Sequence, residues 1–265
     1  VPVSELSVSA GVVSHPSGKS SHYGILAQAA AGKAPNNVTL KDRKDWKLIG
    51  KPAPRGDIPG KTSGSAISGI DVRQPGMLFA SVRMAPMLGG TVQSLDSKAA
   101  LAMPGVTRLV KLDEWAGSTA GFAIVGKTTW HTRQATLAVD VQWAQRAEGA
   151  LDSQRIQSEL QDKLKTETGH TFHEAGSADQ AEAAATRVIT ASYSAPYLAH
   201  ATMEPMNCTA QVKDGKVEVW VPTQVPTAAR TIAAQVAGVS EDAVTLHVTL
   251  LGGGFGRRLD VDFVG

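Results

Sequence analysis

The sequence predicts an α+β fold, and three observations support that class. Between residues 49 and 143 the apolar patterns follow the order strand, short helix, strand, strand, helix, strand, which is typical of α+β domains. Gly and Pro turns separate these runs. The 265 residues are 42% hydrophobic and 19% charged, so the composition is that of a globular protein with a sizeable core.

Residues 1–48 are expected to form a lead-in segment and not a domain with its own core. This segment holds a short alternating run at 6–13, a helical pattern at 23–31 and a charged connection at 41–47. Residues 49–145 are predicted to form the first domain. Its expected helices are 97–102 and 128–138, and its expected strands are 69–72, 77–83, 106–110, 122–125 and 139–143.

Residues 146–186 are predicted to be a helical linker, with helices at 152–166 and 181–185. Residues 187–265 are expected to return to strands. Asp214-Gly215 between two alternating runs is a strong hairpin signal, and Gly238 is placed to end a helix. The expected strands are 187–193, 209–212, 217–221 and 244–250, and the expected helix is 227–237.

Charge and cysteine content exclude several classes of function. The net charge is +2 and no basic stripe alternates with aromatic residues, so we expect no nucleic-acid partner. Cys208 is the only cysteine, which excludes an internal disulfide, a cysteine-based zinc site and an iron–sulfur cluster held by this chain alone. Its apolar neighbours favour a buried structural thiol over a reactive one.

The two ends of the sequence suggest that it is an internal portion of a longer polypeptide. It starts at Val1 without an initiator Met, and the run from 261 to 265 begins like a structural element. Neither a transmembrane run nor a signal-peptide pattern is present in these residues. The residues alone therefore do not predict a cellular location.

The most informative motif is Leu251-Gly252-Gly253-Gly254-Phe255-Gly256-Arg257-Arg258. Glycine contributes no side-chain packing, so such a run after a strand usually marks close backbone approach to a ligand. Successive N–H groups in a glycine turn can bind an anion, and the two arginines add positive charge beside it. The alternative is a tight turn without a ligand. The run matches neither the dinucleotide fingerprint nor a P-loop.

Two further segments contain candidate functional residues. Gln224 lies between two prolines at a strand-to-helix corner, where its amide can donate to an oxo group, although an ordinary turn glutamine is the alternative. His200 and Glu204 are four residues apart, but Pro205 argues against the helix that would make them a metal-ligand pair. We expect them to form a hydrogen-bonded structural pair near a cofactor.

Three segments together resemble the molybdenum-binding large subunit of the xanthine dehydrogenase and aldehyde oxidase family. The resemblance is strongest to the branch of isoquinoline 1-oxidoreductase beta subunits and bacterial aldehyde dehydrogenases. LGGGFGRRLDVDF at 251–263 is similar to the glycine-rich cofactor loop, and YLAHATMEPMNCTA at 197–210 to a second signature. Residues 60–143 resemble the α/β-hammerhead domain. The spacing between Gln224 and Phe255 also matches the family.

The resemblance implies a division into a lead-in (1–48), an α/β-hammerhead domain (49–145), a helical linker (146–186) and the first part of a molybdopterin-binding domain (187–265). It also implies the cofactor-binding residues. Gln224 would direct its amide toward an oxo ligand of molybdenum, and Phe255 would also wall the substrate pocket. The implied set is Gln224, Gly253, Gly254, Phe255, Gly256 and Arg257. Leu259 lies where xanthine dehydrogenases carry a substrate-binding Glu, which makes a purine substrate doubtful.

In this family an electrophilic carbon is oxidised with oxygen from water, and a glutamate near the end of the subunit is the general base. That base is expected after Gly265, so no catalytic residue and no metal ligand is predicted here. The implied cofactor is molybdopterin cytosine dinucleotide with molybdenum. The implied partners are a small subunit with 2Fe–2S clusters, an aldehyde or N-heterocycle, and a cytochrome acceptor. The resemblance favours the bacterial periplasm over the cytoplasm. The competing hypothesis is a non-catalytic structural or subunit-contact module without cofactor.

Overall fold

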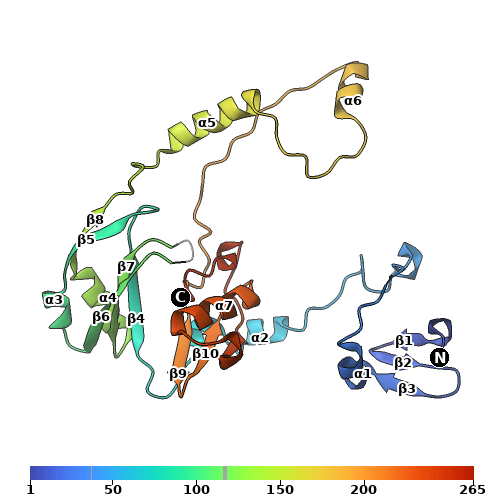
Figure 1. Ribbon diagram of the computed structural model, residues 1–265, viewed down its shortest axis with the longest axis horizontal. Coiled ribbons are helices and arrows are strands. Elements are labelled where there is room, and N and C mark those ends of the chain that lie inside the picture. Colours follow the sequence, from blue (N-terminus) through green and yellow to red (C-terminus); the bar gives the residue numbers. More distant parts are fainter. Residues whose placement is uncertain (37, 116–117) are drawn as a thin grey trace. The chain divides into compact units, whose positions relative to one another are not determined.

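The computed structural model describes residues 1–36, 38–115 and 118–265, with helices and strands as labelled in Figure 1. The chain divides into two compact units, Val1–Pro59 and Gly60–Gly265, which are described separately. Within the described residues, no helix combines the length and the hydropathy needed to cross a membrane.

The first unit contains a small antiparallel sheet followed by a helix. Strands β1 (Ser7–Ser9), β2 (Val12–Ser14) and β3 (Ser20–His22) pair in the order β1-β2-β3, and α1 (Tyr23–Ala30) follows. The β1–β2 turn has positive φ angles at Ala10 (47°) and Gly11 (77°), as a tight hairpin requires. None of the described residues 1–36 and 38–59 is buried. The remaining elements are η1 (Val3–Glu5), η2 (Arg43–Asp45) and α2 (Ile58–Ser63), which crosses into the second unit.

The second unit begins with two sheets and two helices around one apolar cluster. β4 (Phe79–Met84), β7 (Gly121–Gly126) and β6 (Val106–Leu112) form an antiparallel sheet with β7 in the centre, and β5 (Thr91–Asp96) pairs with β8 (Asp140–Ala144). The helices are α3 (Lys98–Leu101) and α4 (Thr129–Leu137). The buried cluster consists of Ala100, Phe122, Ile124, Ala135 and Val139.

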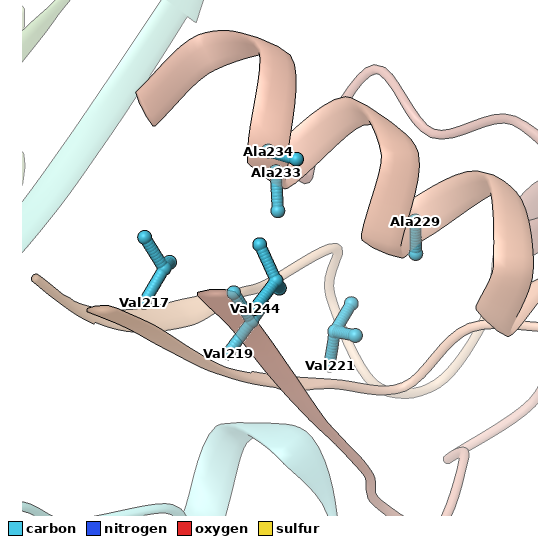
Figure 2. Packing of buried hydrophobic residues seen from close by; sticks show 7 residues of the cluster. All are labelled: Val217, Val219, Val221, Ala229, Ala233, Ala234 and Val244. Carbon is cyan, nitrogen blue, oxygen red and sulfur yellow. The ribbon is translucent and has the colours of Figure 1, made fainter. Parts of the chain in front are cut away.

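A second core lies between a three-stranded sheet and one helix. Strands β9 (Thr209–Lys213), β10 (Lys216–Val221) and β11 (Val244–Val248) are ordered β11-β10-β9, with β10 and β11 parallel. Every second residue of β10 is buried, and these valines face α7 (Pro226–Ala237), as Figure 2 shows. This alternation places one face of the sheet in the core. The cluster consists of Val217, Val219, Val221, Ala229, Ala233, Ala234 and Val244.

The segment between the two cores is exposed. It contains α5 (Ser153–Thr166), which the Asp152 side chain caps, and α6 (Ala178–Ala184), which Ser177 caps. Residues 186–200 contain neither helix nor strand. The short elements η3 (Gly69–Asp71), η4 (Glu241–Ala243) and η5 (Arg257–Leu259) complete the chain.

The mixed helix and strand content confirms the predicted α+β class. Three local predictions were wrong. Residues 187–193 are rich in strand-forming side chains, but among the described residues no strand pairs with them to supply hydrogen bonds. Residues 69–72 contain the 3-10 turn η3, because Ser68 and Asp71 form a capping box. Strand β5 was missed, since a register shift between Val92 and Ser94 interrupts its alternation. The four-part domain division stays a prediction.

Candidate functional site

The structure brings Gln224 and the glycine loop together at the carboxyl ends of two parallel strands. Gln224 follows β10, and the glycine loop follows β11. The Gln224 backbone N–H donates to the Arg258 carbonyl oxygen at 3.0 Å. The Thr223 hydroxyl donates to the same oxygen at 3.3 Å. Ligands commonly bind at the carboxyl edge of parallel strands, so this position suits a binding site.

The glycine loop adopts a backbone that only a glycine-rich sequence tolerates. The φ angles are 105° at Gly253 and 92° at Gly256, and Phe255 also has a positive φ of 52°. A bulky residue in this region is uncommon and points to a local functional constraint. The Phe255 side chain is 76% exposed, so packing does not explain its conformation.

Gly254 is the point at which the Gln224 side chain approaches the loop backbone. A Cβ atom added at Gly254 would lie 2.8 Å from Gln224 Oε1 and 3.2 Å from Gln224 Cδ. Any side chain there would displace the glutamine amide. Because Gln224 is exposed and its side chain forms no hydrogen bond within the described residues, the amide is free to bind a ligand.

Four consecutive backbone N–H groups of the loop are available to a ligand. In the described part of the chain, the N–H groups of Gly253, Gly254, Phe255 and Gly256 have no acceptor. The carbonyl groups of Gly254 and Gly256, by contrast, accept from the N–H groups of residues 257 and 259 at 2.9 and 3.0 Å. The loop therefore presents donors and uses its acceptors internally, which is the arrangement that binds anionic or oxo groups.

Beneath the loop lies a fully buried ion pair between Arg258 and Glu204. The relative exposure of the two side chains is 0% and 4%, and Arg258 Nη2 lies 2.9 Å from Glu204 Oε2. The guanidinium also donates to the carbonyl oxygens of Gly253 (2.9 Å), Pro222 (3.2 Å) and Glu204 (3.0 Å). Burial lowers the pKa of Arg258 and the Glu204 carboxylate raises it. Its ordinary value is so high that the guanidinium stays charged.

The Glu204 carboxylate connects this pair to two other segments. Oε2 accepts from the Gly252 N–H at 2.9 Å, and Oε1 accepts from the Ile70 N–H at 2.9 Å and from Asn207 Nδ2 at 3.1 Å. A Cβ at Gly252 would overlap the Glu204 side chain, so glycine is required for this approach. One carboxylate thus fixes the start of the glycine loop to η3.

Arg257 is also paired, and this modifies the sequence-based expectation of added positive charge. Its guanidinium donates to both Asp262 carboxylate oxygens at 2.8 and 2.7 Å. The hydrogen bonds to Asp262 raise the Arg257 pKa. Since a carboxylate faces each arginine, the donors that remain for a ligand in the described residues are the four loop N–H groups and the Gln224 amide, and not free side-chain charge.

The predicted pairing of His200 with Glu204 was wrong. Glu204 is bonded to Arg258, Ile70, Gly252 and Asn207, while His200 is exposed. His200 instead lies beside Gly256, where an added Cβ would be 3.8 Å from His200 Nε2. Among the described residues, no group of three or more His, Cys, Asp or Glu side chains could hold a metal ion.

Cys208 has the properties of a structural thiol. Burial raises its pKa to about 12, so at neutral pH the reactive thiolate is scarce. Its side chain packs against the cluster between β10 and α7. The raised pKa and the packing support the prediction of a structural thiol, although the residue is half-buried and not fully buried.

Comparison with known proteins links this geometry to one family. Residues 160–263 match the family described as "Molybdopterin cofactor-binding domain". The chain is 35% identical over 245 residues to isoquinoline 1-oxidoreductase subunit beta of Brevundimonas diminuta, covering 89% of this chain and 30% of that protein. It is 32% identical over 237 residues to a Gluconacetobacter polyoxogenes protein named membrane-bound aldehyde dehydrogenase (pyrroloquinoline-quinone), covering 86% and 30%.

A solved structure shows the same fold. Quinoline 2-oxidoreductase from Pseudomonas putida 86 has a TM-score of 0.58 at 18% identity, with 82% of this chain and 32% of that chain covered. The predicted resemblance to molybdenum-binding subunits of the xanthine dehydrogenase and aldehyde oxidase family is confirmed by the family match and the curated relatives, and the solved structure shows the fold alone. The chain spans about 30% of the length of the two curated relatives.

Proposed function

We propose that this chain forms part of a molybdenum-binding subunit that oxidises aldehydes or hydroxylates N-heterocycles with oxygen derived from water. The observation that carries the proposal is the meeting of Gln224 with four unbonded loop N–H groups at the carboxyl ends of β10 and β11. Both segments lie within residues 160–263, the range matched to the molybdopterin cofactor-binding domain. The substrate classes follow the printed names of the relatives.

The cofactor proposed for this site is molybdopterin cytosine dinucleotide with molybdenum. Its oxo and pterin groups are hydrogen-bond acceptors, and the site offers an amide and a row of backbone N–H donors. The glycines leave space for close approach, because Gly253 and Gly256 hold positive φ angles and carry no side chain. The residues present therefore fit such a group. When bound, molybdenum supplies the two-electron redox chemistry.

The residues of this chain orient the cofactor and the substrate. The Gln224 amide is proposed to donate to an oxo ligand, and the N–H groups of Gly254, Phe255 and Gly256 to donate to the cofactor. The exposed Phe255 ring is proposed to wall the substrate pocket. Gly253 and Arg257 are included in the site because they shape the loop at its two sides.

The base and the electron-transfer centres are proposed to come from elsewhere. Glu204, the carboxylate beneath the loop, is buried, and both of its oxygens already accept hydrogen bonds from this chain. As the family resemblance implies, the general base is proposed to lie in a part of the full protein outside these 265 residues. Electrons are proposed to leave through 2Fe–2S clusters on a small partner subunit, and a cytochrome is a further proposed acceptor. Residues 49–145 are proposed to be the α/β-hammerhead domain.

The competing proposal is a structural or subunit-contact module whose glycine loop holds no cofactor. Elemental analysis of the purified protein that carries this chain distinguishes the two. The enzyme proposal predicts about one molybdenum per polypeptide in active material, together with a released cytosine nucleotide after acid hydrolysis. Active protein that contains a quinone cofactor and no molybdenum would refute it.

Substitution of Gln224 tests the assigned residue. Gln224→Ala should lower turnover by about 100-fold, the usual effect of removing one preorganised donor, while the molybdenum content is retained. Gln157→Ala on the exposed helix α5 is the matched control and should leave turnover unchanged. Unchanged turnover in Gln224→Ala at full molybdenum content would show that its assigned role is wrong.

A further inference from the structure

Arg258 is placed to hold two loops at once. Its side chain binds the Gly253 carbonyl of the glycine loop and the Pro222 carbonyl of the segment that leads to Gln224, at 2.9 and 3.2 Å. Its own carbonyl oxygen accepts from the Gln224 N–H at 3.0 Å. A single residue therefore contacts both segments that form the candidate cofactor site, through its side chain and its backbone.

The chemistry of the guanidinium explains why an arginine suits this position. It is planar, permanently charged, and presents five donors in a rigid fork. Three of its nitrogen atoms, Nε, Nη1 and Nη2, donate to four acceptors that come from three different segments. A lysine has three donors on one nitrogen atom, so it can keep the charge but not the full set of directions.

Glu204 makes the burial of this charge tolerable and extends the network. An unpaired buried guanidinium would be strongly unfavourable. Removing one partner of such a pair is therefore more destabilising than replacing both partners with apolar residues. Glu204 also binds the Gly252 N–H, next to the Gly253 carbonyl that Arg258 holds. Glu204 and Arg258 thus form hydrogen bonds with adjacent residues at the start of the glycine loop.

We propose that Arg258, buttressed by Glu204, is the positioning residue that fixes the Gln224 amide relative to the four loop N–H groups. This inference deepens and rests on the proposed function, since the arrangement matters chemically only if the site holds a cofactor. The role differs from general stabilisation of the fold. The core between β10 and α7 is made of valines and alanines and contains neither charged residue.

Amide hydrogen exchange on the full chain tests the proposal without any cofactor. Arg258→Met removes the fork at similar length, Arg258→Lys keeps the charge, and Arg155→Met on α5 is the control at an exposed ion pair. In Arg258→Met, the amides of Gly252 and Gln224 should exchange at least about tenfold faster than in the wild type. Those of β10 and α7 should change less than about twofold. Arg258→Lys should restore part of the local protection, and Arg155→Met should match the wild type.

Three results would overturn the proposal. The first is unchanged exchange at Gly252 and Gln224 in Arg258→Met. The second is an equal loss of protection throughout β10 and α7, which would indicate a purely global role. The third is full wild-type protection in Arg258→Lys, because then the directional contacts of the guanidinium contribute nothing to positioning. If Arg258→Met does not fold, the comparison of Arg258→Lys with the wild type decides, and local loosening confined to the two loops is the supporting result.

The outcome is distinguishable from failure of the proposed function. Absence of molybdenum in active wild-type protein would remove the proposed function, yet the exchange pattern would still report whether Arg258 positions the two loops. Conversely, molybdenum at about one per polypeptide with unchanged exchange in Arg258→Met would leave the function intact and overturn the role of Arg258.

Discussion

Gly254→Ala is expected to perturb the site at one point, because the nearest atoms to the added methyl group all belong to Gln224. The added methyl group would lie 2.8 Å from Gln224 Oε1, closer than real contacts allow, so the glutamine amide must move. Alanine is compatible with the backbone conformation at this position, because φ at Gly254 is not positive. The substitution is therefore expected to displace the Gln224 side chain without strain in the loop itself.

The expected changes in stability and in turnover follow from the displacement of the Gln224 amide alone. The displaced amide is the free end of an exposed side chain without hydrogen bonds in the described residues, so the free energy of unfolding should change by less than about 0.5 kcal/mol. Loss of one preorganised donor at the reacting centre should lower turnover by about 100-fold. Activity and stability are thus expected to separate.

The assay is a double-mutant cycle of Gly254→Ala and Gln224→Ala, with turnover and thermal unfolding measured at matched molybdenum content. Because both changes remove the same amide from its position, the double variant should be no slower than either single variant. Gly169→Ala is the control, since a Cβ there meets no atom within 4 Å. Additive losses in turnover, or normal turnover in Gly254→Ala, would refute the reasoning.

Three further predictions concern other parts of the second unit. Gly69→Ala should lower the free energy of unfolding by about 1–3 kcal/mol in denaturant titrations, because its Cβ would lie 2.6 Å from Pro222 Cδ and also overlap Asn207; an unchanged midpoint would contradict this. Gly238→Ala should cost about 1 kcal/mol, since φ is 68° at the end of α7 and no atom hinders the methyl group; stabilisation would contradict it. Because burial raises the Cys208 pKa to about 12, native protein should react with iodoacetamide at pH 8 at least about 100-fold more slowly than unfolded protein. The unfolded thiol ionises first, so the free energy of unfolding should fall as pH rises above 9.0; a rise would contradict the assigned burial.

The parts of the fold that depend on residues adjacent in the sequence were predictable from the sequence. Asp214-Gly215 forms the expected hairpin turn, with φ angles of 51° and 71°, because this dipeptide tolerates the left-handed region. Gly238 ends α7 for the same conformational reason. In contrast, residues 187–193 have strand-forming side chains but no pairing strand, and no local pattern reveals whether a partner is present.

The ligand-facing residues of the candidate site were predictable from the sequence, but the buried ion pair beneath them was not. The glycine run and Gln224 stand out locally, and the structure places them side by side. The partner of Glu204 was not predictable, because Arg258 lies 54 residues away and the nearer His200 offered a more obvious pair. Glu204 precedes β9 and Arg258 follows β11, and the two strands belong to one sheet ordered β11-β10-β9, an arrangement that no local sequence pattern reveals.

The measurement that tests the central claim most directly is anomalous diffraction at the molybdenum edge from crystals of the purified protein that carries this chain. The proposed function predicts an anomalous peak in contact distance of the Gln224 side chain and of the N–H groups of Gly254, Phe255 and Gly256. A peak in active protein that lies away from these residues, or active crystals with no peak, would contradict it.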